Sequence, residues 1–177
     1  MATQLNLPIA DRIEQKLSVV HDAAQKRALE LLLRPAVSGS VSQCLTTAGL
    51  VIKVGGSTLA KTGAADAYFV VDGALVKIAA GTDMPALTGF GISAGLYNVV
   101  CFFVDQAGTV TANLGIEGAD IAHVVFPTVP EGKAMVGFLL ITYASAFVGG
   151  TTALDTATTL YFSPTGDLNP GLVNSLG

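Results

Sequence analysis

Residues 67–79 read AYFVVDGALVKIA. Two runs rich in β-branched and aromatic residues, 67–71 and 74–79, flank the dipeptide Asp72-Gly73. An Asp-Gly pair between two such runs favours a two-residue hairpin turn, because both turn positions need a positive φ that Asp tolerates and Gly adopts freely. The stretch therefore predicts an antiparallel β-hairpin.

Runs of the same composition continue on both sides of this hairpin, separated by turns rich in Gly, Asp, Thr and Pro. The further predicted strands are 41–46, 50–54, 58–62, 97–104, 109–113, 121–126, 135–143 and 158–163. No helical period alternates with them. The pattern predicts a mainly β fold, a jelly-roll-like antiparallel β-sandwich over residues 37–163.

A different composition precedes Pro35. Residues 1–34 hold 9 of the 22 charged residues. Asn6 is suited to cap a helix over residues 8–33, Pro8 is tolerated in its first turn, and the Arg34-Pro35 step ends it. The apolar residues recur every three or four positions and form one stripe. We therefore expect one N-terminal amphipathic α-helix in an arm over residues 1–36, and an extended C-terminal arm over residues 164–177.

The predicted helix supplies the candidate interface. Its last turn, residues 29–33, is apolar on several sides, which indicates either a contact with another subunit or a helix lying on its own domain. The candidate interface residues are Ile13, Leu17, Val20, Ala24, Ala28, Leu31, Leu32 and Leu33.

The overall composition favours assembly. Hydrophobic residues make up 51% of the chain and charged residues only 12%, and the mean hydropathy is +0.60. Burial in a homo-oligomer or against a partner explains this composition better than a monomer. The net charge is −4 and the cations do not cluster, so we expect no nucleic-acid partner and no membrane partner.

Residues 134–152 carry no charge and are strongly apolar over 135–147. This run is shorter than a bilayer requires and contains Thr, Tyr and Ser, so it predicts a buried strand followed by a loop. The N-terminus lacks the apolar core and basic flank of a secretory signal, and we expect assembly in a cytoplasm.

Few residues offer chemistry. Cys44 and Cys101 resemble small buried residues and are expected to be free thiols. His21 and His123 lack ligands at metal-binding spacing, although His123 lies near Asp120 and Glu117. The carboxylates fall mostly at turns, and there is no tryptophan to stack on a sugar. We expect no catalytic residues, no cofactor and no metal.

The segment Val51-Ile52-Lys53-Val54-Gly55-Gly56-Ser57-Thr58-Leu59 resembles the first strand and glycine turn of the amino-acid kinase family. That resemblance implies a small phosphotransferase in which Lys53 and Gly55-Gly56 contact ATP phosphates. The family is larger and α/β, whereas here another strand-like run follows at once. A two-strand hairpin that turns at Gly55-Gly56 is the alternative.

Three other segments resemble virion proteins of tailed bacteriophages. They are Tyr97-Asn98-Val99-Val100-Cys101-Phe102-Phe103-Val104-Asp105 with Gly108-Thr109-Val110, the run from Ala122-His123-Val124 to Val136-Gly137-Phe138, and Phe147-Val148-Gly149-Gly150-Thr151-Thr152-Ala153-Leu154-Asp155. The resemblance implies a capsid decoration (cement) protein on the capsid exterior, commonly a trimeric β-sandwich that binds the major capsid protein. A tail or receptor-binding component is the alternative within the same resemblance.

Overall fold

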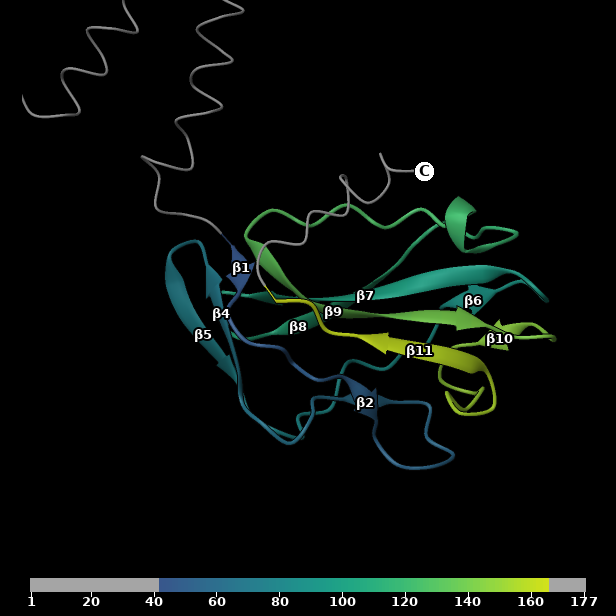
Figure 1. Ribbon diagram of the computed structural model, residues 1–177, viewed down its shortest axis with the longest axis horizontal. Helices are drawn as coiled ribbons and strands as arrows, with labels where there is room; N and C mark the ends of the chain where they lie inside the picture. Colours follow the sequence, from purple (N-terminus) through teal and green to yellow (C-terminus); the bar gives the residue numbers. More distant parts are fainter. Residues whose placement is uncertain (1–41, 166–177) are drawn as a thin grey trace, which may run out of the picture. The chain divides into compact units, whose positions relative to one another are not determined.

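The computed structural model describes residues 42–165, which form the coloured, β-rich part of Figure 1. Residues 1–41 and 166–177 lie outside this description. The predicted helix over residues 8–33, the eight candidate interface residues on it and most of the predicted C-terminal arm therefore stay predictions.

The described part is mainly β, and its strands pair antiparallel throughout. One 3₁₀ helix, η1 (Ile121–His123), interrupts the strands. The strands are β1 (Gln43–Cys44), β2 (Val51–Ile52), β3 (Ala60–Lys61), β4 (Ala67–Val71), β5 (Ala74–Ile78), β6 (Gly91–Ile92), β7 (Tyr97–Asp105), β8 (Val110–Leu114), β9 (Lys133–Thr142), β10 (Phe147–Val148) and β11 (Thr158–Phe162).

The largest sheet has four strands in the order β11-β9-β7-β8. Its centre is the pair β7–β9, which runs from Tyr97 opposite Thr142 to Asp105 opposite Lys133, with a register shift between Phe102 and Phe103. The uncharged run after Lys133 is thus the predicted buried strand. Seven of the nine residues of β7 are buried, and they belong to both faces of the sheet, so both faces must be covered.

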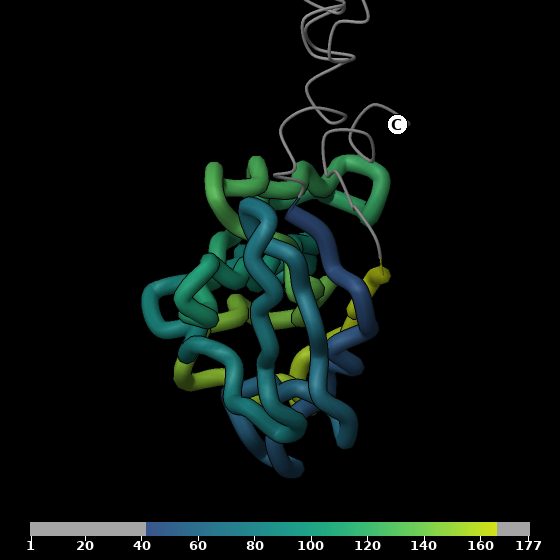
Figure 2. The backbone as a smooth tube through the Cα atoms, turned by 90° about the vertical axis from the view of Figure 1, so that its left-hand side faces the viewer, coloured from purple at the N-terminus to yellow at the C-terminus, as the bar shows by residue number. Residues whose placement is uncertain are grey.

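The hairpin predicted from residues 67–79 is present. Asp72 has a φ of 48° and Gly73 a φ of 78°, the left-handed backbone that the two-residue turn requires. Strand β1 pairs with the other side of β4, with Gln43 opposite Val70, which gives a sheet of order β1-β4-β5. Figure 2 shows the β4–β5 hairpin crossing one end of the four-stranded sheet.

The main hydrophobic core lies between these two sheets. It contains Phe69 and Val71 of β4, Phe102 of β7 and Leu139 of β9, each fully buried. The small sheets β2-β3 and β10-β6 extend it, since Ala60 and Phe147 belong to the same cluster. We call the face of the four-stranded sheet that points into this core the first face, and the opposite face the second face.

One predicted strand was wrong, and two short strands were not predicted. Residues 121–126 do not form a strand: Asp120 accepts a hydrogen bond from the backbone N–H of His123, which stabilises η1, and only Val125 bridges to Ile116. Strands β6 and β10 were missed, because two-residue strands leave no alternating pattern. Among the described residues, no helix is long and apolar enough to cross a membrane.

Candidate interaction surface

The second face of the four-stranded sheet has its own smaller core. Val99, Cys101 and Phe103 alternate along β7, and Met135 and Leu140 of β9 lie beside them, all buried. This cluster contains no residue of the β1-β4-β5 sheet. Its cover is the connection between β8 and β9, residues 115–132, which we call the covering segment.

The covering segment lies close against the sheet. The backbone N–H of Gly115 donates to the carbonyl oxygen of Val99 at 2.8 Å, and Gly118 and Tyr97 exchange two backbone hydrogen bonds. A Cβ atom on Gly115 would lie 2.5 Å from the carbonyl oxygen of Val125 and 2.7 Å from Val99. Glycine is therefore needed at position 115 for this approach. Val124 then enters the second-face cluster as the segment returns toward β9.

Three phenylalanines continue the apolar second face from the covering segment to the edge of the sheet. Phe126 meets Phe138 of β9 edge-on, with ring centroids 5.0 Å apart, and Phe138 stacks on Phe162 of β11, with centroids 4.7 Å apart. Both geometries are favourable for aromatic rings. The row joins β9, β11 and the covering segment on one face.

The covering segment does not extend over the second face of β11. Leu160 and Phe162, which lie opposite Leu140 and Phe138 of β9, are 48% and 41% exposed. Cross-strand partners share a face, so both side chains belong to the second face. We call Phe138, Leu160 and Phe162 the β11 patch.

The outer edge of β11 is flanked by the segment that contains β2. The backbone N–H of Leu50 donates to Ser163 Oγ at 2.8 Å, just after β11. The backbone N–H of Leu154 donates to the carbonyl oxygen of Ser57 at 2.9 Å, a few residues before β11. These bonds hold the segment from Leu50 to Ser57 near both ends of β11. Strand β11 nevertheless remains an edge strand of the four-stranded sheet, and its exposed apolar side chains lie on the second face.

A second exposed apolar group lies on the outer side of the covering segment. Ile116 and Val125 face each other across an isolated antiparallel bridge and are 66% and 39% exposed. Ile121 of η1 is also exposed. Unlike the β11 patch, this group is interspersed with the carboxylates of Glu117 and Asp120.

Charge is distributed unevenly over the described part. Four lysines and eight carboxylates lie between residues 42 and 165, with no arginine. Two of the lysines are paired: Lys53 lies 2.5 Å from Asp83 and Lys77 lies 2.6 Å from Asp66. No charged residue occurs in 134–154 or 156–166, so the strands that carry the β11 patch are uncharged beyond Lys133.

The segment that resembles the amino-acid kinases forms the alternative hairpin. Strand β2 pairs with β3, and Gly56 occupies the turn with a φ of +76°. The backbone N–H of Gly56 donates to Asp155 Oδ2 at 2.7 Å, and the Lys53 ammonium lies beside Asp83. The two groups that would meet a phosphate in that family each contact a carboxylate of this chain.

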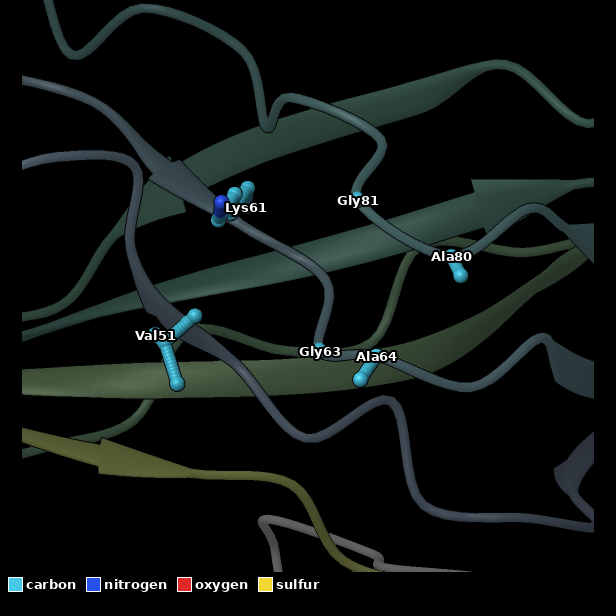
Figure 3. A pocket seen from close by; sticks show the side chains of 6 residues that line it. All are labelled: Val51, Lys61, Gly63, Ala64, Ala80 and Gly81. Atoms are coloured by element: carbon cyan, nitrogen blue, oxygen red, sulfur yellow. The ribbon is translucent and has the colours of Figure 1, made fainter.

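A shallow groove of about 530 Å³ lies beside this hairpin (Figure 3). Val51 and Lys61 line it from β2 and β3, and two nearby turns complete it. The turn residues are Gly63, Ala64, Ala80 and Gly81. Lys61 is the single charged side chain of the groove, which otherwise offers aliphatic groups and backbone.

His123 pairs with Asp120 rather than with Glu117. Its Nδ1 lies 2.6 Å from Asp120 Oδ1, and this hydrogen bond is the main cause of the lowered pKa of the Asp120 carboxyl. The Glu117 carboxylate instead accepts from the backbone N–H of Ser93 at 3.1 Å. Both His123 and Asp120 are exposed. No group of three or more His, Cys, Asp or Glu side chains that could hold a metal occurs in the described part.

Both cysteines are free and buried, as expected from the sequence. Burial raises the pKa of the Cys101 thiol to about 12. Burial also raises the pKa of Cys44, against the opposing effect of a hydrogen bond from its thiol to the carbonyl oxygen of Thr46. Both thiols are therefore protonated at neutral pH and are poor nucleophiles.

The sequence-predicted interface residues lie outside the described residues, and the β11 patch was not predicted. A signal for it exists in Thr158-Thr159-Leu160-Tyr161-Phe162, which carries apolar side chains on both faces of one strand. Tyr161 packs toward the main core, so Leu160 and Phe162 must point the other way. Comparison of the chain with protein-family models, with curated proteins and with solved structures found no match.

Proposed function

We propose that this chain is a non-enzymatic virion structural protein of a tailed bacteriophage, a cement protein that binds the outer capsid surface and stabilises the particle. The observation that carries the proposal is the uncharged, exposed β11 patch on a body with few charges. Contiguous exposed apolar side chains mark protein contact surfaces. Particle components use many such modest contacts, which add by multivalency.

The proposal also includes a fold topology, an oligomeric state and a role for the N-terminal arm. A jelly-roll-like topology is favoured by two antiparallel sheets that share one core. A homotrimer on a local symmetry axis of the capsid is favoured by the apolar composition and by the resemblance to decoration proteins. The N-terminal arm, with Ile13, Leu17 and Leu31 on its apolar stripe, is proposed as a further contact with a neighbouring subunit or with the major capsid protein.

The proposal is tested by locating the chain in particles. Virions whose genome encodes this chain are purified and labelled with gold-conjugated antibodies raised against residues 42–165. Label spread evenly over the head supports a cement protein on the capsid exterior. Label confined to the tail supports the alternative of a tail or receptor-binding component, and unlabelled intact virions overturn a virion role.

A second assay tests the phosphotransferase alternative. ATP affinity of the purified chain is measured by calorimetry, with Lys53→Ala as the matched variant. Affinity that the variant loses would favour the enzyme and contradict a purely structural role. We expect no heat of binding from either protein, since Lys53 and the Gly56 N–H already meet carboxylates.

A further inference from the structure

We propose that the outer edge of β8 is a two-fold contact between copies of this chain, in which β8 of one copy pairs antiparallel with β8 of another. This inference goes beyond the proposed function and does not depend on a role in a virion. A two-fold contact joins single copies, or whole trimers, in pairs.

The ends of β8 show which of its backbone groups point away from the sheet. The backbone N–H of Asp105 donates to the carbonyl oxygen of Thr109 at 3.1 Å, and the N–H of Gly115 donates to that of Val99 at 2.8 Å. Successive residues of an antiparallel strand direct their N–H and C=O groups to opposite sides. Residues 109, 111, 113 and 115 therefore bond toward β7, and the outward groups belong to Val110, Ala112 and Leu114.

These outward groups are unpaired. Among the described residues, none hydrogen-bonds to the backbone of Val110, Ala112 or Leu114 on this side. The next outward residue, Ile116, already exchanges two backbone hydrogen bonds with Val125, at 2.9 and 3.2 Å. The edge thus pairs with an antiparallel strand at Ile116, and its free part is β8 itself. A row of alternating donors and acceptors is the feature that an extended strand recognises.

Strand β8 also lacks the features that protect an edge. Natural edge strands are commonly blocked by lysine, proline, a bulge or a covering segment. Strand β5 carries Lys77, and the segment from Leu50 to Ser57 lies near both ends of β11. Strand β8 reads Val-Thr-Ala-Asn-Leu, with no charge and no proline, and its pairing with β7 has no register shift.

The sequence of β8 suits a second β8. A two-fold axis at Ala112 places Val110 opposite Leu114 of the other copy, and Thr111 opposite Asn113. Val110, Ala112 and Leu114 pack against the main core, so Thr111 and Asn113 lie on the second face. Apolar side chains therefore meet apolar ones and polar side chains meet polar ones at every position. A foreign strand would not require this symmetry of β8.

The hydrogen bonds of this arrangement are complete. Three outward N–H groups of each copy meet three outward carbonyl oxygens of the other, which pairs every free group of both edges. The charged residues nearest this edge, Asp105 and Glu117, lie beyond the two ends of β8. Because both are acidic and the chain has a net charge of −4, screening by salt should strengthen the contact.

The first test is the solution mass of the full-length chain, measured by light scattering after size exclusion at low and high salt. We expect the wild type at an even multiple of 18.0 kDa and Ala112→Pro at half the wild-type mass. Proline removes the central outward N–H without removing a bond to β7, and edge strands tolerate it. The matched control is Ala112→Ser, which keeps this N–H and should keep the wild-type mass. Circular dichroism verifies that each variant is folded.

The second test is a cross-link that depends on the register. Thr111 and Asn113 of opposite copies form a non-hydrogen-bonded pair, whose Cα atoms lie about 4.5 Å apart. This distance suits a disulfide. A mixture of the Thr111→Cys and Asn113→Cys proteins should therefore cross-link faster on mild oxidation than either variant alone, because a residue and its own counterpart are only diagonal neighbours. Native Cys44 and Cys101 are buried and should not react in the folded protein.

Three results overturn the inference. These are a wild type with one chain or an odd number of chains, a folded Ala112→Pro variant that keeps the wild-type mass, or a mixture that cross-links no faster than the single variants. If Ala112→Pro does not fold, the cross-link decides. A monomeric wild type that loses its attachment to particles on Ala112→Pro would assign the edge to a strand of another protein. None of these outcomes affects the labelling of virions.

Discussion

The rings of Phe138 and Phe162 stack with their centroids 4.7 Å apart and their planes 15° from parallel. The two residues also lie opposite each other in the β9–β11 ladder. Strand β11 is thus joined to β9 by side chains as well as by backbone hydrogen bonds, at the end where the chain leaves the sheet.

This stacking predicts a measurable coupling. Phe138→Ala should lower the free energy of unfolding by about 2–4 kcal/mol, since its ring meets both Phe126 and Phe162. Phe162→Ala should cost about 1 kcal/mol, because that ring is partly exposed. In a double-mutant cycle followed by urea unfolding, the two changes should couple by about 0.5–1.5 kcal/mol. Strict additivity of the two changes in unfolding free energy would contradict the stacking of the two rings.

The close approach of β9 and β11 predicts the effect of a single methyl group. A Cβ atom at Gly137 would lie 2.4 Å from the carbonyl oxygen of Phe162 and 2.7 Å from Leu50. Gly137→Ala should therefore lower the free energy of unfolding by about 1–3 kcal/mol. The control is Gly55→Ala, where the nearest atom lies 3.8 Å away and the change should stay within about 0.5 kcal/mol. Equal losses of unfolding free energy for Gly137→Ala and Gly55→Ala in urea titrations would refute this packing.

The β4–β5 turn predicts a backbone effect without any loss of contact. Gly73 has a φ of 78°, and a residue with a Cβ atom in this region costs about 1–2 kcal/mol. Gly73→Ala should reduce the free energy of unfolding by that amount, whereas Gly73→Asn should cost less because Asn adopts this backbone more readily. Thermal unfolding checks the order of stability of the two variants. A Gly73→Asn variant less stable than Gly73→Ala would contradict the left-handed turn at Gly73.

The buried Cys101 thiol predicts a dependence of stability on alkaline pH. Its pKa is raised to about 12 in the folded chain, against about 8.5 in an unfolded one. The folded state favours the neutral thiol, so the contribution is fully present below pH 8.5 and is lost as pH rises toward 12. The difference in unfolding free energy between the wild type and Cys101→Ala should therefore narrow as pH rises above about 9.

The control for this pH experiment is Val99→Ala. Val99 is buried on the same face of β7 and cannot ionise, so its difference from the wild type should stay constant over the same pH range. Thiol labelling gives an independent measurement: a disulfide reagent at pH 8 should modify Cys101 only after unfolding. Rapid labelling of the folded chain would show that the thiol is accessible.

Much of the β architecture could be predicted from local sequence. The hairpin around Asp72-Gly73 and the long strands β7 and β9 carry strong local signals, namely turn dipeptides and uncharged β-branched runs. Strand existence was predicted better than strand length, because ends depend on tertiary pairing. Residues 121–126 were predicted wrongly, since Asp120 satisfies a backbone N–H locally and favours η1 over a strand.

The sequence predicted the strand that contains Leu160 and Phe162, but it did not predict which face of the sheet these side chains occupy. Leu160 and Tyr161 occupy adjacent positions, and both side chains are largely apolar. The local sequence therefore does not indicate which of them packs into the main core. That choice depends on where Leu50 and Ile52 pack and on where the covering segment ends, which are relationships between residues far apart in the sequence.

The covering segment has a consequence for how this chain can vary. Connections between strands ordinarily tolerate insertions and deletions, because little depends on their path. Here residues 115–132 form the wall over Val99, Cys101 and Phe103, with glycines at 115 and 118 where no side chain fits. A tag or an extra loop inserted into the covering segment would expose the second face of the four-stranded sheet to water. Variation in length should instead be accommodated at turns such as Gly81 and Gly89, which face open space.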